Sequence, residues 1–117
     1  MKKILVINND FDTMSLLKNW LEKKGFEVTF SGNRKEVVSI IKEFKPQLLI
    51  VDILQNAILD DIKTNKYSST LPVLLMTGYT LRRYGKHFPG DDTIEKPFDL
   101  NLLERKINDL MNTSEVV

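Results

Sequence analysis

The sequence contains no cysteine, a single histidine and no long apolar run. Without cysteine, the chain forms no disulfide, has no thiolate nucleophile and offers no thiolate to a metal ion. His87 by itself is no metal site. No apolar stretch approaches the roughly 20 residues of a membrane-spanning helix. The net charge is +1, which provides no global attraction to nucleic acid or to an anionic membrane. We therefore expect no direct contact with either.

The start of the chain has neither the pattern of a signal peptide nor a glycine-rich loop. The first apolar run, Ile4–Ile7, is too short for the core of a signal peptide, so we expect a cytoplasmic protein. It leads into Asn8-Asn9-Asp10 and not into a glycine-rich loop of the kind that binds dinucleotides or the phosphates of ATP. The length of 117 residues suits one domain, residues 1–117, with a single core.

The most informative stretch is Leu48-Leu49-Ile50-Val51-Asp52. Four consecutive apolar residues are typical of a strand that is buried on both faces, as at the centre of a parallel sheet. This strand ends in a carboxylate. In open α/β sheets, ligands bind outside the carboxyl ends of the strands, so Asp52 is a candidate site residue. The alternative is a carboxylate that only caps a neighbouring segment or forms a salt bridge.

Strand-like and helix-like segments alternate along the chain. Strands are expected at residues 4–7, 26–30, 48–52, 73–77 and 93–95, with apolar residues at helical spacing between and after them. The first helix should begin at a cap formed by Asp12 or Thr13 and bury Leu16. The third helix should span 57–66, and the last should follow a cap at Asp99. This alternation predicts a doubly wound α/β fold, a parallel sheet with right-handed crossovers and helices on both faces.

Polar residues stand at the ends of four of these strands. Asn8-Asn9, Asp52, Thr77 and Lys96 come at carboxyl ends, which a parallel sheet brings to one edge. An ammonium group there offsets the charge of a phosphate, and a hydroxyl group donates to one of its oxygens. A carboxylate can itself be the nucleophile and form an aspartyl phosphate. The constellation predicts a site for a transferred phosphoryl group.

At these residues the sequence resembles the receiver domain of two-component response regulators, from Lys3 to about Met111. Asp52, then Thr77-Gly78, then Lys96-Pro97-Phe98 look like the family's phosphoacceptor, switch hydroxyl and invariant lysine. The resemblance implies a flavodoxin-like fold, with a five-stranded parallel sheet in the order 2-1-3-4-5 and helices on both faces. It also implies signal transduction by a phosphorelay, with a histidine kinase or a phosphotransfer protein as partner. It implies no enzyme beyond self-phosphorylation and dephosphorylation at Asp52.

The clearest departure from the family pattern concerns the metal. The family has two acidic residues after the first strand that hold Mg²⁺, and here Asn8 and Asn9 occupy those positions. Mg²⁺ prefers hard oxygen ligands, usually including one or two carboxylates. The remaining set is Asn8, Asn9, Asp52 and the backbone carbonyl of Leu54, while Asp10 points elsewhere if the strand register holds. We expect Mg²⁺ binding to be weak or absent. Turn chemistry is the alternative explanation of the two asparagines.

Other departures concern the signalling surface. Thr93 occupies the family's aromatic switch position, and Asn56 replaces a proline four residues after Asp52. Residues 79–92 should be the least regular segment, because glycine and proline interrupt its helical spacing. Its basic stretch, 81–87, is either a solvated face or a contact for an acidic partner.

Two mechanisms therefore stay open, together with one rival class of protein. In the first mechanism, Asp52 accepts phosphate slowly with a weakly bound Mg²⁺. In the second, the domain is a pseudo-receiver that binds an unphosphorylated docking partner. A monomer or a weak dimer is expected in both. The rival is a small flavodoxin-like protein or enzyme that binds a nucleotide or a flavin, which the missing glycine-rich loop disfavours.

Overall fold

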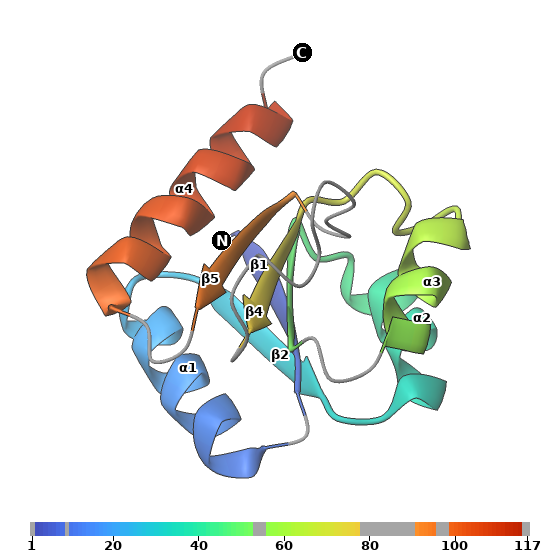
Figure 1. The fold of residues 1–117 in the computed structure, drawn as a ribbon, viewed down its shortest axis with the longest axis horizontal. Helices are drawn as coiled ribbons and strands as arrows, with labels where there is room; N and C mark the ends of the chain where they lie inside the picture. Colours follow the sequence, from blue (N-terminus) through green and yellow to red (C-terminus); the bar gives the residue numbers. More distant parts are fainter. Residues whose placement is uncertain (1, 9, 53–55, 78–90, 96–98, 116–117) are drawn as a thin grey trace.

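A parallel sheet with helices on both faces makes up the computed structural model, which describes residues 2–8, 10–52, 56–77, 91–95 and 99–115. Its strands are β1 (Lys3–Ile7), β2 (Glu27–Ser31), β3 (Leu48–Asp52), β4 (Val73–Thr77) and β5 (Asp92–Glu95). The helices of the described residues are α1 (Phe11–Lys23), α2 (Arg34–Phe44), α3 (Asn56–Thr64) and α4 (Leu100–Glu115) (Figure 1). The strand order β2-β1-β3-β4-β5 confirms the predicted topology.

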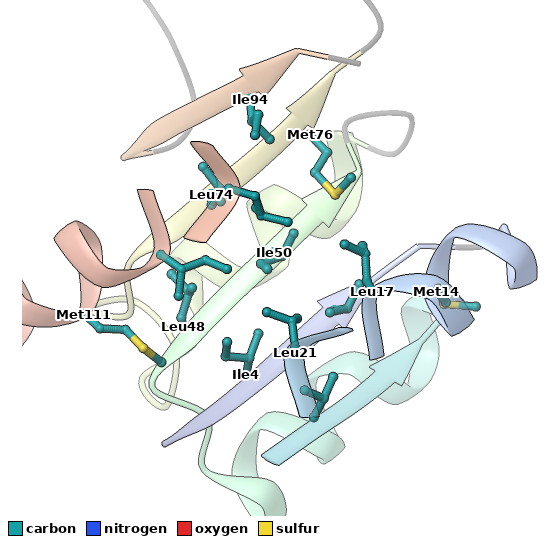
Figure 2. Packing of buried hydrophobic residues seen from close by; sticks show 14 residues of the cluster. Ile4, Met14, Leu17, Leu21, Leu48, Ile50, Leu74, Met76, Ile94 and Met111 are labelled. Carbon is teal, nitrogen blue, oxygen red and sulfur yellow. The ribbon is translucent and has the colours of Figure 1, made fainter. Parts of the chain in front are cut away.

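The two faces of the sheet carry separate cores. Helices α1 and α4 cover one face, and α2 and α3 cover the other (Figure 1). Strand β1 shows the alternation: Ile4 and Val6 pack with α1 and α4, whereas Leu5 and Ile7 pack with α2 and α3. Figure 2 shows the first core, where Leu17 of α1 lies against the strands. Because both faces are covered, the central strands are continuous apolar runs.

Polar side chains determine where the helices begin. Helix α1 follows Asp10, whose carboxylate accepts hydrogen bonds from the Asp12 N–H (3.2 Å) and the Thr13 hydroxyl (2.6 Å). The predicted cap at Asp12 or Thr13 is therefore wrong. Asp10 has the extended backbone of an N-cap, and the two later residues already lie in the first helical turn. The predicted cap at Asp99 is confirmed, since its carboxylate accepts from the Asn101 N–H at 2.7 Å.

The burial of α1 differs from the prediction at one position. Leu16 is 57% exposed, whereas Met14, Leu17 and Leu21 are buried against the sheet. Successive helical residues are turned by about 100°, so Leu16 cannot share the centre of the face that contains its neighbour Leu17. The predicted burial of Leu16 is wrong.

Several element boundaries also differ from the prediction. Helix α3 ends at Thr64 and not at residue 66, because the Asn65 side chain accepts a hydrogen bond from the Tyr67 N–H (2.9 Å) and closes a local turn. Strand β2 begins and ends one residue later than expected. Strand β5 begins one residue earlier, at Asp92, which lies opposite Leu74 of β4. None of these shifts changes the topology.

The segment 79–92 is represented among the described residues only by Asp91 and Asp92. Asp91 holds the start of β4, because its N–H donates to the Val73 carbonyl (2.9 Å) and its carboxylate accepts from the Val73 N–H (2.7 Å). The predicted irregularity of 79–92 otherwise concerns residues outside the described ones, and so does the basic stretch 81–87. Within the described residues, no helix combines the length and apolarity that a membrane crossing requires.

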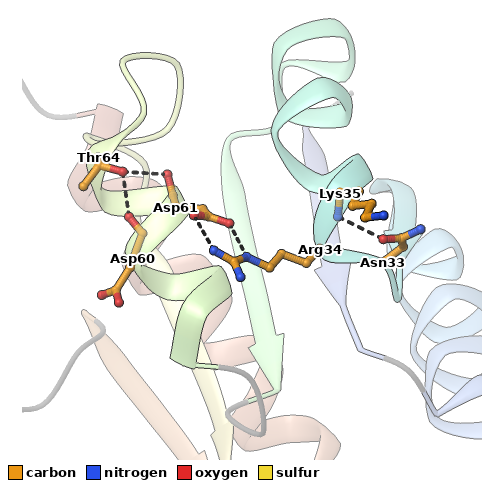
Figure 3. A network of polar contacts seen from close by, with 6 residues as sticks. All are labelled: Asn33, Arg34, Lys35, Asp60, Asp61 and Thr64. Atoms are coloured by element: carbon orange, nitrogen blue, oxygen red, sulfur yellow. Dashed lines mark hydrogen bonds and ion pairs between the residues drawn. The ribbon is translucent and has the colours of Figure 1, made fainter.

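A bidentate ion pair connects α2 to α3. Arg34, the first residue of α2, donates from Nε and Nη2 to the two carboxylate oxygens of Asp61, at 2.7 and 3.2 Å (Figure 3). The hydrogen bonds from Arg34 lower the pKa of Asp61 below its usual value of 3.8, and the same contact raises the pKa of Arg34. Both side chains are accessible to solvent, so screening limits the energy of the pair.

We expect the Arg34–Asp61 pair to stabilise the fold slightly near neutral pH and to lose this contribution progressively in acid. The folded-state pKa of Asp61 is depressed, so the stabilising contribution is present above the unfolded pKa and is lost as pH falls through the folded pKa. A double-mutant cycle with Arg34→Gln and Asp61→Asn, followed by urea unfolding at pH 7 and pH 3, measures it. A coupling that is unchanged in 1 M salt, or that is no smaller at pH 3 than at pH 7, would contradict this expectation.

Candidate functional site at the carboxyl edge of the sheet

The carboxyl ends of β1, β3, β4 and β5 lie side by side. In the parallel register, Ile7 is opposite Val51, Asp52 is opposite Met76, and Thr77 is opposite Glu95. Asp52 and Thr77 are the last residues of their strands, and Asn8 directly follows β1. The strand order thus brings the backbones of Asn8, Asp52 and Thr77 to one edge. Asp52 and Thr77 are assigned to the site on this backbone position and on the sequence pattern.

Three other predicted site residues lie outside the described ones. They are Asn9, Leu54 and Lys96. Lys96 directly follows Glu95, which ends β5 beside Thr77. The predicted proximity of the Lys96 side chain to Asp52 stays a prediction, as does any contribution of Asn9 or of the Leu54 carbonyl to a metal site.

Asn8 is a buried polar residue at this edge. Its exposed fraction is only 4%, and its N–H donates to the Ser31 carbonyl at the end of β2 (3.0 Å). The side-chain oxygen of Asn8 accepts a hydrogen bond from the Asp10 N–H at 2.7 Å, which forms a turn between β1 and α1. This bond supports turn chemistry as one reason for asparagine here. Burial gives a second reason, because a neutral amide loses less solvation than a carboxylate.

Asp10 has a structural role that was not predicted from the sequence, the N-cap of α1. Its two carboxylate oxygens accept from the Asp12 N–H and from the Thr13 hydroxyl, at the amino end of α1. A negative charge there is favoured by the helix dipole. The signal for this role is an acidic residue followed two positions later by a second acid in the first helical turn. Both carboxylate oxygens of Asp10 therefore accept hydrogen bonds from the first turn of α1.

The two described side chains that follow β1, Asn8 and Asp10, are poorly suited to bind a magnesium ion. Asn8 offers a neutral oxygen that already accepts a backbone hydrogen bond, and the Asp10 carboxylate caps α1. Among the side chains that the structure describes, no group of three His, Cys, Asp or Glu residues could hold a metal ion. Mg²⁺ gives up its water reluctantly and requires charged oxygen ligands in return. Of these two side chains, Asn8 is neutral, and the oxygens of Asp10 already accept hydrogen bonds from α1.

Thr93 lies in the middle of β5, at the position where the family has an aromatic switch residue. Its exposed fraction is 7%, and it lies opposite Leu75 of β4. A small β-branched side chain in this place is buried within the sheet. It contains no ring that could move between an inward and an outward position.

Comparison with known proteins assigns the chain to a family. A family profile described as the response regulator receiver domain matches residues 4–108. An uncharacterized 14.6 kDa protein encoded in the sodA1 3′ region of Leptolyngbya boryana is 30% identical over 104 residues, covering 82% of this chain and 79% of that protein. The chain therefore belongs to the receiver domain family of two-component response regulators.

Other relatives are longer than this chain. The transcriptional regulatory protein CpxR of Escherichia coli (strain K12) is 30% identical over 120 residues, covering 97% of this chain and 51% of CpxR. The chain thus spans about half the length of that relative. Such longer proteins contain material that has no counterpart in these 117 residues.

Solved structures agree with the assignment. A response regulator receiver modulated diguanylate cyclase from Pelobacter carbinolicus superposes with a TM-score of 0.86 at 30% identity, covering 98% of this chain and 96% of that one. A two-component response regulator from Clostridium difficile gives a TM-score of 0.83 at 27% identity, with 96% and 97% covered. The family match favours the receiver interpretation over the nucleotide- or flavin-binding alternative.

Proposed function

We propose that this receiver domain signals mainly by binding partner proteins, and that Asp52 accepts a phosphoryl group only slowly. The observation that carries the proposal is Asn8. It is a buried, neutral amide at the sheet edge that Asp52 shares, in a position where the family has an acid. Because Asn9 follows it in the sequence, the edge lacks two of the family's negative charges.

The chemistry proposed for Asp52 is simple acyl phosphate formation. An oxygen of the carboxylate attacks phosphorus, a new oxygen–phosphorus bond forms, and the bond to the donor's imidazole or acetate breaks. Thr77 and Lys96, by the family resemblance, bind the oxygens of the transferred group. Lys96 then contributes the positive charge at this edge, so transfer occurs with less stabilisation than a pocket with strong metal binding provides.

The replacement of the aromatic switch residue also supports output by docking. Thr93 is buried within β5 and has no aromatic ring, so a change at the phosphorylation site cannot be relayed by rotation of a ring at this position. A partner that recognises the unphosphorylated surface needs no such relay. The proposed partners are a histidine kinase, a phosphotransfer protein or another protein bound without phosphorylation. We propose no enzymatic activity beyond phosphorylation and dephosphorylation of Asp52 itself.

Incubation with acetyl phosphate and Mg²⁺ tests this proposal. We expect the intact mass to show that only a minor fraction of the chain gains one phosphoryl group. The Asp52→Asn variant, which keeps the side-chain size and removes the nucleophile, should gain none. Rapid and complete labelling of the native chain at low Mg²⁺ would overturn the proposal that docking dominates.

A further inference from the structure

An exposed tyrosine between two lysines lies beyond the end of α3. Tyr67 is 46% exposed, and the Nζ atoms of Lys42 and Lys66 lie 5.7 and 5.2 Å from the centre of its ring. Lys42 belongs to the last turn of α2, whereas Lys66 and Tyr67 follow α3. Both lysines are exposed. The ring therefore brings together two cations from separate parts of the chain, within the range of cation–π attraction.

The turn that carries Tyr67 is well fixed by hydrogen bonds. The Tyr67 N–H donates to the Asn65 side-chain oxygen at 2.9 Å. The next residue, Ser68, is 1% exposed, and its hydroxyl donates to the Ile62 carbonyl at 2.6 Å. An aromatic side chain on such a turn is already positioned for a partner, which reduces the entropy lost on binding.

The chain segments on either side of this contact are rich in lysine. Residues 42–45 and 63–67 contain four lysines and one glutamate. Lysines at helix C-termini also stabilise the helix dipole, and that accounts for part of the pattern. It does not account for a half-exposed tyrosine in their midst, because such a ring adds little to the core. Tyrosine is enriched in the centres of protein interfaces.

This surface lies at the opposite end of the sheet from Asp52. The Lys3 ammonium group at the start of β1 donates to the carbonyl of Phe44, the last residue of α2 (3.2 Å). The Gln47 N–H donates to the Lys3 carbonyl (2.8 Å), just before β3 begins. The carboxyl end of α2 therefore adjoins the starts of β1 and β3, whereas Asp52 ends β3.

We propose that Lys42, Lys66 and Tyr67 form a docking site for an acidic segment of a partner protein. Carboxylates of the segment pair with the two ammonium groups, and its apolar atoms cover the tyrosine ring. The proposal rests on the proposed docking function and names a surface for it. The partner would be able to bind whether or not Asp52 is phosphorylated, since the two sites lie at opposite ends of the sheet.

Charge favours a protein segment over a membrane or a nucleic acid. The chain as a whole has a net charge of only +1, and Glu43 directly follows Lys42. Anionic membranes are bound through dense clusters of basic residues, and nucleic acids through strongly basic faces. Two lysines around one ring suit a few carboxylates spaced along a peptide.

Fluorescence anisotropy with the whole chain tests the site. The probe is a fluorescein-labelled ten-residue peptide with six glutamates, and its glutamine counterpart is the control peptide. At low salt we expect binding of the glutamate peptide. Lys42→Gln plus Lys66→Gln should weaken it at least about tenfold and Tyr67→Ala by several-fold, whereas Tyr67→Phe should bind nearly as the native chain does.

The matched control is Lys23→Gln plus Lys35→Gln, which removes the same charge from exposed positions on α1 and α2. It should change the affinity less than twofold. Equal weakening by both double variants, no binding of the glutamate peptide, or binding only to phosphatidylserine vesicles or RNA would overturn the proposed site. Asp52 labelling is a separate readout, so failure of the docking site and failure of the proposed function can be distinguished.

Discussion

Replacing Asn8 and Asn9 by aspartate should tighten Mg²⁺ binding at least about tenfold, which corresponds to ~1.4 kcal/mol. The change restores two negative charges beside Asp52, at the edge where the family holds its metal. It should also speed the labelling of Asp52 by acetyl phosphate. In the native chain we expect Mg²⁺ to bind in the millimolar range or more weakly, about −4 kcal/mol at most.

Stability gives an independent readout of the same variant. Asn8 is 4% exposed, so an aspartate in its place is a largely buried charge. Without Mg²⁺ the double variant should therefore be less stable than the native chain, because the new carboxylate at position 8 loses solvation. Added Mg²⁺ should restore stability by binding only the folded state. The native chain should respond little to the same addition.

Magnesium titration followed by Trp20 fluorescence or amide chemical shifts measures these affinities. Asn19→Asp plus Asn108→Asp is the matched control, because it adds the same charge at exposed positions on α1 and α4. It should leave Mg²⁺ binding unchanged. Saturation of the native chain at tens of micromolar Mg²⁺ would show that the amides rebuild a functional metal site, and the proposal of slow phosphorylation would then be withdrawn.

Leu103→Ala should lower the free energy of unfolding by about 3 kcal/mol, the usual cost of truncating a buried leucine. Leu103 is fully buried in the core that α1 and α4 form with the sheet. The substitution removes apolar contact and leaves a cavity that the rigid strands cannot close. For a domain of this size, the loss corresponds to a decrease in Tm of about 10 °C.

The neighbouring residue provides the control for this substitution. Leu102 is 39% exposed, so Leu102→Ala should cost less than about 1 kcal/mol. Urea unfolding followed by circular dichroism compares the two variants. Similar losses from both would mean that α4 does not pack on the sheet through Leu103.

The sequence by itself determined the topology. The stretch Leu48–Val51 is apolar at every position because its strand is covered on both faces, and Val73–Met76 has the same character. Strands of this kind, alternating with amphipathic helices, have few ways to pack. The parallel sheet with helices on both faces followed from this pattern. The order of the strands, which brings their polar ends to one edge, came from the resemblance to the receiver family. Asp52 and Thr77 could be chosen as site residues because each directly follows an apolar run, and Lys96 because it follows the short predicted strand 93–95.

Local choices between adjacent polar residues depended on backbone geometry. Asp10, Asp12 and Thr13 are all acceptable helix caps by composition, and the turn that Asn8 closes made Asp10 the cap. The exposure of Leu16 likewise followed from the rotation of α1 on the sheet, which a spacing pattern defines only to within a residue.

Only the tertiary structure decided which distant polar residues meet. The Arg34–Asp61 pair joins residues 27 positions apart, and Lys42 of α2 reaches the ring of Tyr67 in the turn that follows α3. Each of these side chains is exposed or half-exposed. Residues at such positions follow no spacing pattern, so the sequence does not show which of them will be in contact. Their contacts depend on how α2 and α3 lie against each other on one face of the sheet. That packing is set by buried apolar residues such as Val37 and Ile62, whose pattern predicts a core but not the polar pairs above it.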